Sequence, residues 1–333
     1  MPIFGTDVQC PRCLTVFRTP SKLEEVLPCK ECKFDIPMAY QRDYKKIPPV
    51  FVQLIGLSAA GKTTFLDMLR LHLYDMDQLW PEFYAQPITQ LDADNKVTLL
   101  NERERGILAG TTNKRERNQN EAYIMALKNM PRWHSRFLVL MDHAGEQFLN
   151  LTIQAEDMPF LRHTPVAIVL LSLSDLVREG KRVDDLVTNY ITTLEKKKVN
   201  FAKERRQLII VFSKADIIVN LSPEIQDYLS KDTLYMDMRE HRQNVRLGEP
   251  ELELYLQWMH YISDQTSLWI RNYVKSGPAM LNMLKDRGIA ARFTVMSSTG
   301  RPISGDTNTL VPTPRRVLDP LFWVLEYYRQ HNR

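Results

Sequence analysis

Residues 51–65, FVQLIGLSAAGKTTF, carry the residue types and the spacing needed to hold a phosphate group. Gly56 is followed after four residues by Gly61, Lys62 and Thr63, which is the spacing of a phosphate-binding loop. Glycines let successive backbone N–H groups point at phosphate oxygens, the lysine reaches the terminal phosphates, and the threonine hydroxyl can ligate Mg²⁺. The candidate phosphate-binding residues are Gly56, Ser58, Ala59, Ala60, Gly61, Lys62, Thr63 and Thr64.

The residues on either side of this loop separate phosphate binding from the alternative, a plain glycine turn. Apolar residues of strand character precede Gly56, and Phe65, Met68 and Leu69 follow the loop at helical spacing. A helix that begins here turns the positive end of its dipole toward a bound anion. The context therefore favours phosphate binding.

The four cysteines form two C-x₂-C pairs, Cys10 with Cys13 and Cys29 with Cys32, separated by fifteen residues. This spacing is typical of a zinc ribbon, in which four thiolates close a tetrahedral structural site. Two disulfides are the competing reading, but the N-terminus has no export signal and disulfides are rare in a reducing compartment. A redox C-x₂-C is not expected to be duplicated in this way. We expect the ribbon to support the fold or to dock a protein.

An apolar strand is predicted over residues 136–141, and it ends in Asp142-His-Ala-Gly145. Residues 122–127 also have strand composition, and the turn residues 129–131 make the two segments a hairpin. A carboxylate at the end of a strand beside a phosphate loop can hold Mg²⁺, and a glycine N–H can approach a γ-phosphate closely. Asp142 could instead cap a helix, but the phosphate loop upstream favours the metal role.

The D-x-x-G at the end of this strand resembles the third signature of Ras-like GTPases. Further along, Ser213-Lys214-Ala215-Asp216 follows an apolar strand and resembles the N-K-x-D guanine motif, with serine in place of asparagine. The resemblance implies that Asp216 accepts two hydrogen bonds from guanine, which adenine cannot supply. It also implies that the Lys214 stem covers the base, while the serine departs from the residue that normally braces the loop.

A second base loop is expected at residues 297–299, where Ser297-Ser298-Thr299 looks like the family's S-A-x signature with serine for alanine. The candidate base-binding residues are therefore Ser213, Lys214, Asp216, Ser297 and Ser298.

The resemblance further implies binding of GTP·Mg²⁺ and slow attack of water on the γ-phosphate. Thr63 and Asp142 would position Mg²⁺, and the Gly145 N–H would meet the γ-phosphate. Either Thr111 or Thr112 is the switch threonine, with Thr112 also a candidate Mg²⁺ ligand; both could be ordinary loop hydroxyls.

The position after Gly145 carries a water-orienting glutamine in many Ras-like relatives but is Glu146 here, with Gln147 next. Because the γ-phosphate repels a carboxylate, hydrolysis is expected to be very slow or to need Gln147 or a partner's arginine. Glu146 could equally be an acidic residue in the first turn of a helix. The candidate catalytic residues are Lys62, Glu146 and Gln147.

The predicted elements give an α/β fold with a doubly wound, mostly parallel sheet and nucleotide at the carboxyl ends of its strands. Further strands are expected near residues 166–171, 208–212 and 291–296, with helices near 99–108, 183–194 and from 319 onward. The predicted domains are a zinc ribbon at 1–40, an extended linker at 41–49, and a GTPase domain at 50–333 with a helical insertion at 217–266. This combination resembles prokaryotic GTPases of the "double-GTPase" type linked to conflict systems.

The composition of the chain argues against two classes of function, nucleic-acid binding and membrane crossing. The chain has 333 residues, 25% of them charged and 44% apolar, and its formal charge of +4 is too small to indicate nucleic-acid binding. No apolar run reaches the roughly 18 residues that cross a bilayer, so a cytoplasmic protein without membrane contact is expected.

Two functions of different class remain open at this point. One is a GTPase switch or scaffold that changes its contacts with a protein effector or regulator. The other is an adaptor that holds GTP without hydrolysing it and docks a partner through its zinc ribbon. Glu146 is the feature that supports this second hypothesis. An ATPase or nucleotide kinase is a third possibility, against which the S-K-A-D segment counts.

Overall fold

The structure is a computed structural model. It describes residues 6–20, 26–57, 60–104, 122–150, 152–153, 158–178, 183–218, 220–234, 236, 248–300 and 313–331.

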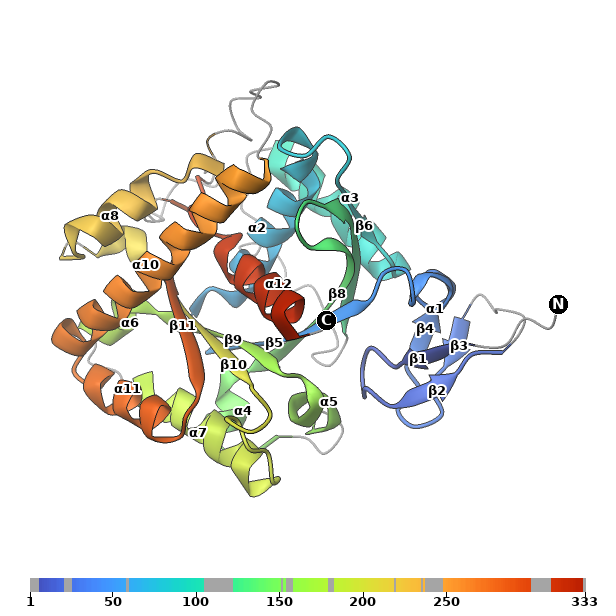
Figure 1. Ribbon diagram of the computed structural model, residues 1–333, viewed down its shortest axis with the longest axis horizontal. Helices are drawn as coiled ribbons and strands as arrows, with labels where there is room; N and C mark the ends of the chain where they lie inside the picture. The colour runs from blue at the N-terminus through green and yellow to red at the C-terminus, as the bar shows by residue number, and fades with distance from the viewer. Residues whose placement is uncertain are drawn as a thin grey trace.

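A seven-stranded sheet with the order β11-β10-β9-β5-β8-β7-β6 forms the centre of the molecule (Figure 1). Strands β8, β5, β9, β10 and β11 run parallel to one another, while β7 is antiparallel to β8 and β6 to β7. The expected doubly wound, mostly parallel sheet is therefore confirmed. Its strands are β5 (Pro49–Gly56), β6 (Tyr84–Pro87), β7 (Tyr123–Met130), β8 (His134–Ala144), β9 (Val166–Ser172), β10 (Gln207–Ser213) and β11 (Ala290–Val295).

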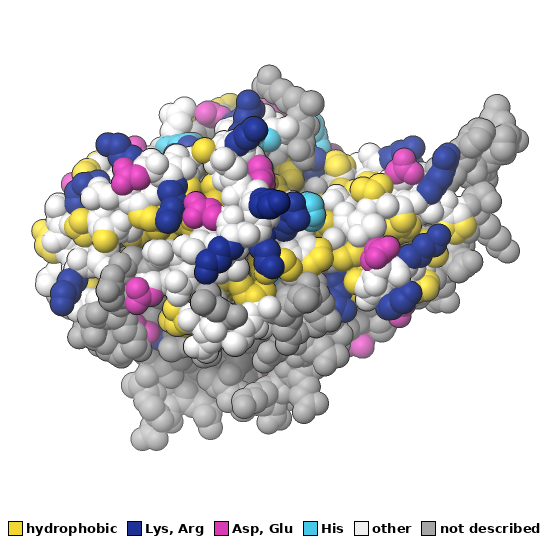
Figure 2. All heavy atoms as spheres, turned by 90° about the horizontal axis from the view of Figure 1, so that it is seen from below, with side chains coloured by type: hydrophobic (Ala, Val, Ile, Leu, Met, Phe, Trp, Pro, Cys, Tyr) yellow, Lys and Arg dark blue, Asp and Glu magenta, His cyan; other side chains and the backbone are white. Residues whose placement is uncertain are grey.

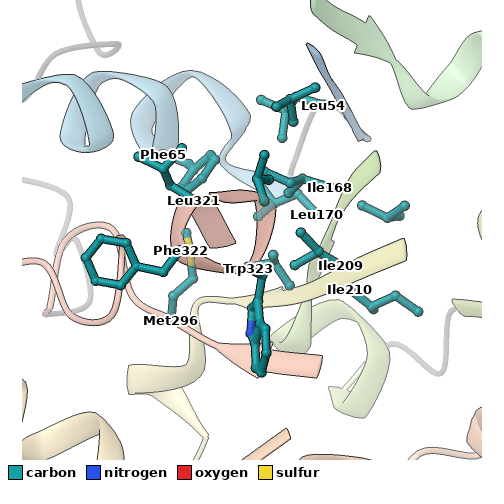
Figure 3. Packing of buried hydrophobic residues seen from close by; sticks show 14 of the residues in the cluster. Leu54, Phe65, Ile168, Leu170, Ile209, Ile210, Met296, Leu321, Phe322 and Trp323 are labelled. Atoms are coloured by element: carbon teal, nitrogen blue, oxygen red, sulfur yellow. The ribbon is translucent and has the colours of Figure 1, made fainter. Parts of the chain in front are cut away.

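The central strand β5 is buried along its whole length because helices or other segments cover both faces of the sheet. Leu54 points into the core under α2 and α12, where side chains from these helices meet those of β5, β9 and β10 (Figure 3). The neighbouring Gln53 points to the other face. There its amide N–H₂ donates to the carbonyls of Leu161 and Thr164, and its oxygen accepts from the Tyr190 hydroxyl.

The structure has the helices expected after the phosphate loop, near residues 183–194, within residues 217–266 and from residue 319, and it has further helices that were not predicted. The described helices after β5 are α2 (Lys62–Asp75), α3 (Gln90–Glu104), α4 (Gly145–Leu149), α5 (Met158–His163), α6 (Leu173–Arg178), α7 (Val183–Lys196), α8 (Pro223–Ser230), α10 (Glu249–Tyr273), α11 (Gly277–Asp286) and α12 (Asp319–His331). The helix expected from residue 99 begins at Gln90 instead. Thr89 explains the earlier start, because its hydroxyl accepts from the Asp92 N–H and donates to the Asp92 carboxylate, which caps the first turn.

The C-terminal helix α12 holds the start of β5 through one hydroxyl group. The Tyr328 hydroxyl donates to the Phe51 carbonyl at 2.9 Å and accepts from the Phe51 N–H at 3.0 Å. Strand β9 pairs with β5 only from Val52 onward, so this hydroxyl takes the place of a strand partner for Phe51. The first strand of the large sheet and the last described helix are thereby joined in one buried contact.

The N-terminal segment forms two hairpins and a short helix. They pack on β7 and β8, on the face of the sheet to which Gln53 points. They comprise β1 (Asp7–Gln9), β2 (Val16–Arg18), β3 (Val26–Pro28), β4 (Asp35–Pro37) and α1 (Met38–Asp43). The Tyr40 ring lies 4.9 Å from that of Phe137 on β8, and its hydroxyl donates to the Gln9 carbonyl. Val8, Ile36 and Ile47 lie in the same apolar cluster as Phe137.

An extended linker was predicted at residues 41–49, but residues 41–43 belong to the last turn of α1. The reason is that β4 pairs with β3 and that Tyr40 on α1 reaches the sheet. The domain boundaries themselves remain predictions.

One face of the molecule, seen in Figure 2, carries basic side chains interspersed with acidic and uncharged ones. Among the described residues, no helix combines the length and the apolar character that a bilayer crossing requires.

We predict that Tyr328→Phe lowers the free energy of unfolding by about 1–3 kcal/mol, because it leaves a buried N–H and C=O of Phe51 without a partner. Tyr273→Phe is the matched control, since Tyr273 is 62% exposed. Chemical denaturation of both variants measures the effect. Equal stability of the two variants would contradict the proposed role of the hydroxyl.

Candidate functional site

The phosphate loop connects the end of β5 at Gly56 to the first residue of α2 at Lys62. Gly61 precedes the helix with φ of 80°, a left-handed conformation that glycine adopts without strain. Strand β5 has β8 on one side and β9 on the other, so the connections from the centre of the sheet diverge at its carboxyl end. Ligands of open α/β sheets bind at such a switch point.

Two glycines bring the D-x-x-G segment into contact with the phosphate loop. A Cβ on Gly145 would lie 2.8 Å from the Gly56 carbonyl carbon and 3.0 Å from its oxygen. A Cβ on Gly56 would in turn lie 2.9 Å from the Leu170 oxygen on β9. Side chains at these two positions would force the strands apart, so the sequence pattern has a direct steric cause.

Lys62 and Asp142 lie together at the opening of this loop. The Lys62 Nζ is 3.0 Å from Asp142 Oδ1 and donates to the His143 carbonyl at 2.8 Å. The Asp142 side chain is 40% exposed, and that of Lys62 is 12% exposed. Thr63 is exposed in the first turn of α2, and Thr64 is half-buried beside it. Lys62 on α2, predicted to bind phosphate, and Asp142 on β8, predicted to bind Mg²⁺, therefore meet.

His143 is a participant that the sequence reasoning did not identify. Alternation along β8 turns its ring away from Asp142, onto the face that packs against Phe160. Burial lowers the pKa of its imidazole to about 3, and the charge of Lys62 adds to this shift. The ring is therefore neutral at physiological pH, and its contribution to the site is the backbone carbonyl that binds Lys62.

The S-K-A-D segment contacts the phosphate loop from the other side. The Ser213 hydroxyl lies 2.8 Å from the Ala60 carbonyl and 3.2 Å from that of Leu171, and it can donate to either. Serine thus braces the loop despite replacing the asparagine of the family motif. Asp216 follows half-buried in the short 3-10 helix η3 (Ala215–Ile217), after Lys214 in a left-handed conformation with φ of 56°.

The second base loop is joined to the first by a backbone hydrogen bond from the Ala215 N–H to the Met296 carbonyl. Ser297 is fully buried, and its hydroxyl accepts from the Gly300 N–H at 2.8 Å. That hydroxyl therefore shapes the loop, while Ser298 is half-buried beside it.

Both candidate catalytic residues after Gly145 lie in the first turn of α4 and are half-buried. The position of Glu146 agrees with the alternative reading of a first-turn acid, which suits the positive end of a helix. The Gln147 side-chain oxygen is buried without a hydrogen-bond partner among the described residues. Ser58, Ala59, Thr111 and Thr112 lie outside the described residues.

The four cysteines come together in a separate cluster at the N-terminus, with all four Sγ atoms within 4.8 Å of one another. Cys10 and Cys32 lie 3.6 Å apart, as do Cys13 and Cys29, and none forms a disulfide. A tetrahedral zinc with bonds of 2.3 Å separates its sulfurs by about 3.8 Å, so the cluster has the size for such an ion.

The two knuckles have the same backbone structure. The N–H of Cys10 donates to Thr15 and that of Cys29 to Phe34, five residues on in each case. Leu14 and Lys33, which follow the second cysteine of each pair, both have positive φ. Burial raises the pKa of the Cys10 thiol and raises that of Cys32 to about 11. A cation that replaces their protons reverses this penalty.

Comparison with known proteins places the part of the chain that carries the phosphate loop in a family. The family model for Double-GTPase 2 matches residues 50–249. Among solved structures, the chain is similar to one in the signal recognition particle receptor SRb-GTP/SRX complex from Chaetomium thermophilum. The sequence identity is 12%, the match covers 78% of this chain and 94% of that chain, and the TM-score is 0.33. No curated protein matches the sequence. The family match spans the phosphate loop, the D-x-x-G segment and the S-K-A-D segment, and the chain belongs to the Double-GTPase 2 family.

Proposed function

We propose that the chain binds GTP·Mg²⁺ at the carboxyl edge of the sheet and hydrolyses it slowly as a nucleotide-controlled switch. Family membership supports guanine-nucleotide binding. The observation that carries the proposal is the position of the phosphate loop between two other motifs. Ala60 contacts Ser213, and Lys62 contacts Asp142, so three segments distant in sequence converge at one loop.

Phosphate binding would begin with the opening of the Lys62–Asp142 pair. The lysine Nζ would move to the phosphate oxygens, and the Asp142 carboxylate, together with Thr63, would hold the metal ion. A partly exposed ion pair contributes little stability, so separating Lys62 from Asp142 would need little free energy. When bound, Mg²⁺ neutralises charge on the phosphate oxygens. The backbone N–H groups at the start of α2 stabilise the same charge.

Selection of the base is assigned to Asp216. Its carboxylate would accept hydrogen bonds from the N1–H and the exocyclic amine of guanine, while adenine would leave it unpaired. The Ser213 contact with Ala60 keeps this loop at a fixed distance from the phosphate loop. Base recognition and phosphate binding therefore share one rigid frame.

Hydrolysis needs a group that orients water at the γ-phosphate. Gln147 is a candidate because its side-chain oxygen is buried and lacks a partner among the described residues. Glu146 in the same turn carries a charge that the γ-phosphate repels, so we propose that intrinsic turnover is slow and that a protein regulator accelerates it. The proposed switch segments are residues 106–120, which lie outside the described residues, and 142–162.

The second candidate function is an adaptor that holds GTP without turnover. The observation in its favour is the location of Glu146 where many relatives carry glutamine.

For the cysteine cluster we propose a structural zinc ion that stabilises the ribbon against β7 and β8. The ribbon hairpins are three residues per strand, too small to form a stable core without a metal. Four thiols that serve as metal ligands also favour a reducing compartment, and we propose the cytoplasm.

We predict that Lys62→Ala lowers the rate of phosphate release from GTP by about a hundredfold or more. The variant loses the positive charge that would stabilise the negative charge developing on the γ-phosphate. Lys203→Ala is the control, since Lys203 is exposed on a distant loop. Phosphate release and nucleotide affinity are measured with GTP and with ATP. Tight GTP binding without turnover in the unmodified protein would favour the adaptor, and a preference for ATP would defeat both functions.

We also predict that the purified protein carries one zinc ion and that Cys29→Ser loses it and lowers the melting temperature. Loss of zinc loosens the ribbon, which uncovers the apolar face around Phe137. Glu31→Ser, at an exposed position in the same knuckle, should keep both metal and stability. Elemental analysis and calorimetry distinguish the variants. Full stability of the zinc-free Cys29→Ser protein would refute the structural role.

A further inference from the structure

The second base loop is held in place by a short segment that precedes α12. Ser297 and Arg315 form an antiparallel backbone bridge, in which the N–H of each donates to the carbonyl of the other. The Thr313 N–H donates to the Thr299 carbonyl at 2.8 Å. Gly300 ends the loop with φ of 70°, and a Cβ at this position would collide with the Thr313 carbonyl. The segment therefore fixes the backbone of the loop.

Arg316, the next residue, anchors this segment to the end of α8. Its Nε donates to the Tyr228 carbonyl at 2.8 Å, and its Nη2 donates to the Lys231 carbonyl at 2.7 Å. Its backbone N–H donates to the Asp232 carboxylate. The guanidinium carbon also lies 3.6 Å from the centre of the Tyr228 ring. Carbonyls at the C-terminal end of a helix lack partners within the helix and carry partial negative charge, so a guanidinium binds them well.

A second contact ties the start of α12 to the same helix and to its neighbour. Asp319 is fully buried, and its two carboxylate oxygens accept from the hydroxyls of Tyr228 and Tyr255 at 2.5 Å each. Tyr228 lies on α8 and Tyr255 on α10, and the two helices pack side by side (Figure 1). The chain from Arg316 to Asp319 is thus held at both ends by helices that follow the S-K-A-D segment in the sequence.

Arg316 holds its position at two costs in free energy. Its φ is 59°, in the left-handed region that residues with a side chain adopt only with strain. Its side chain is 1% exposed, so a charge is also taken out of water. Glycine would avoid the first cost, and an apolar side chain would avoid the second. What the guanidinium supplies in return is a set of donors in fixed directions, which define where the segment lies and not only that it is buried.

We propose that Arg316 is a positioning residue for guanine binding, which ties the second base loop to α8 through residues 313–315. The inference rests on the proposed function, because it assigns the effect of this tie to the affinity for the base. The two base loops are joined by the hydrogen bond from the Ala215 N–H to the Met296 carbonyl, so a displaced second loop would also disturb the loop that carries Asp216. The phosphate loop has its own contacts with β8 and β10 and should depend less on Arg316.

Hydrogen–deuterium exchange of the nucleotide-free, full-length protein tests the tie without any ligand. Arg316→Met keeps a long side chain but loses the donors, and it should raise exchange of the Ser297 and Gly300 N–H groups about tenfold or more. Arg206→Met is the matched control. Arg206 is 3% exposed and also donates to backbone carbonyls at the end of a helix, but it precedes β10 and lies at the end of that strand opposite Ser213. Unchanged exchange in Arg316→Met would overturn the inference.

Nucleotide affinity tests the link to the base. Arg316→Met should weaken GTP binding about tenfold or more and change the binding of magnesium tripolyphosphate, which has no base, less than twofold. Arg316→Lys keeps the charge but not the planar set of donors, so it should show smaller effects of the same sign in both measurements. Circular dichroism checks the fold, and Arg316→Lys carries the test if Arg316→Met does not fold. Arg206→Met should bind GTP as the unmodified protein does.

Two results would refute the role of Arg316 in guanine binding. One is faster exchange of the loop with unchanged GTP affinity. The other is an equal loss of affinity for GTP and for tripolyphosphate, which would show a general structural effect. An unmodified protein that binds no GTP would instead refute the proposed function, and the exchange result would still decide whether Arg316 holds the loop.

Discussion

The close packing of Gly145 against Gly56 is the constraint on which the proposed site depends. It places the end of β8 directly against the start of the phosphate loop, because a Cβ on Gly145 would lie 2.8 Å from the Gly56 carbonyl carbon. Asp142 thereby reaches Lys62. On the other side, the Ser213 hydroxyl reaches Ala60. The described part of the loop, from Ala60 to Lys62, is thus held between the two segments that the proposed function requires.

The alternation of side chains along β8 links this site to the N-terminal ribbon. Asp142 lies on the side of the phosphate loop, whereas His143 and Phe137 lie on the face shared by Phe160 and the ribbon. The strand that presents the proposed metal ligand is therefore covered by the segment that holds the four cysteines. On the opposite side, Tyr328 fixes the start of β5. The proposed metal site at the ribbon and the proposed nucleotide site at the loop thus adjoin neighbouring strands.

Much of the fold could be predicted from the sequence because the motifs have fixed spacings and end buried strands. The apolar runs before Gly56, Asp142 and Ser213 predicted strands that the structure confirms. The cysteine pairs predicted a cluster of four thiols, which is also present. Local patterns of this kind survive in the folded chain because a strand end and a glycine turn depend mainly on nearby residues.

Contacts between distant segments could not be read in the same way. Nothing in the sequence indicated that the Ser213 hydroxyl would contact the Ala60 carbonyl or that the His143 carbonyl would bind Lys62. Nor did it indicate that the ribbon would pack on the sheet through a contact of Tyr40 with Phe137. Strand β6 was missed because it is four residues long and pairs only with β7 at the sheet edge. The early start of α3 was missed although Thr89 and Asp92 have the spacing of a capping pair.

The most direct measurement of the central claim is the affinity of an Asp216→Asn variant for GTP and for xanthosine triphosphate. Asparagine exchanges one acceptor for an N–H donor, which matches the carbonyl that xanthine has in place of the guanine amine. The account predicts that GTP affinity falls about a hundredfold or more while affinity for xanthosine triphosphate rises above it. Unchanged GTP affinity in the folded variant would show that Asp216 does not read the base and would contradict the account.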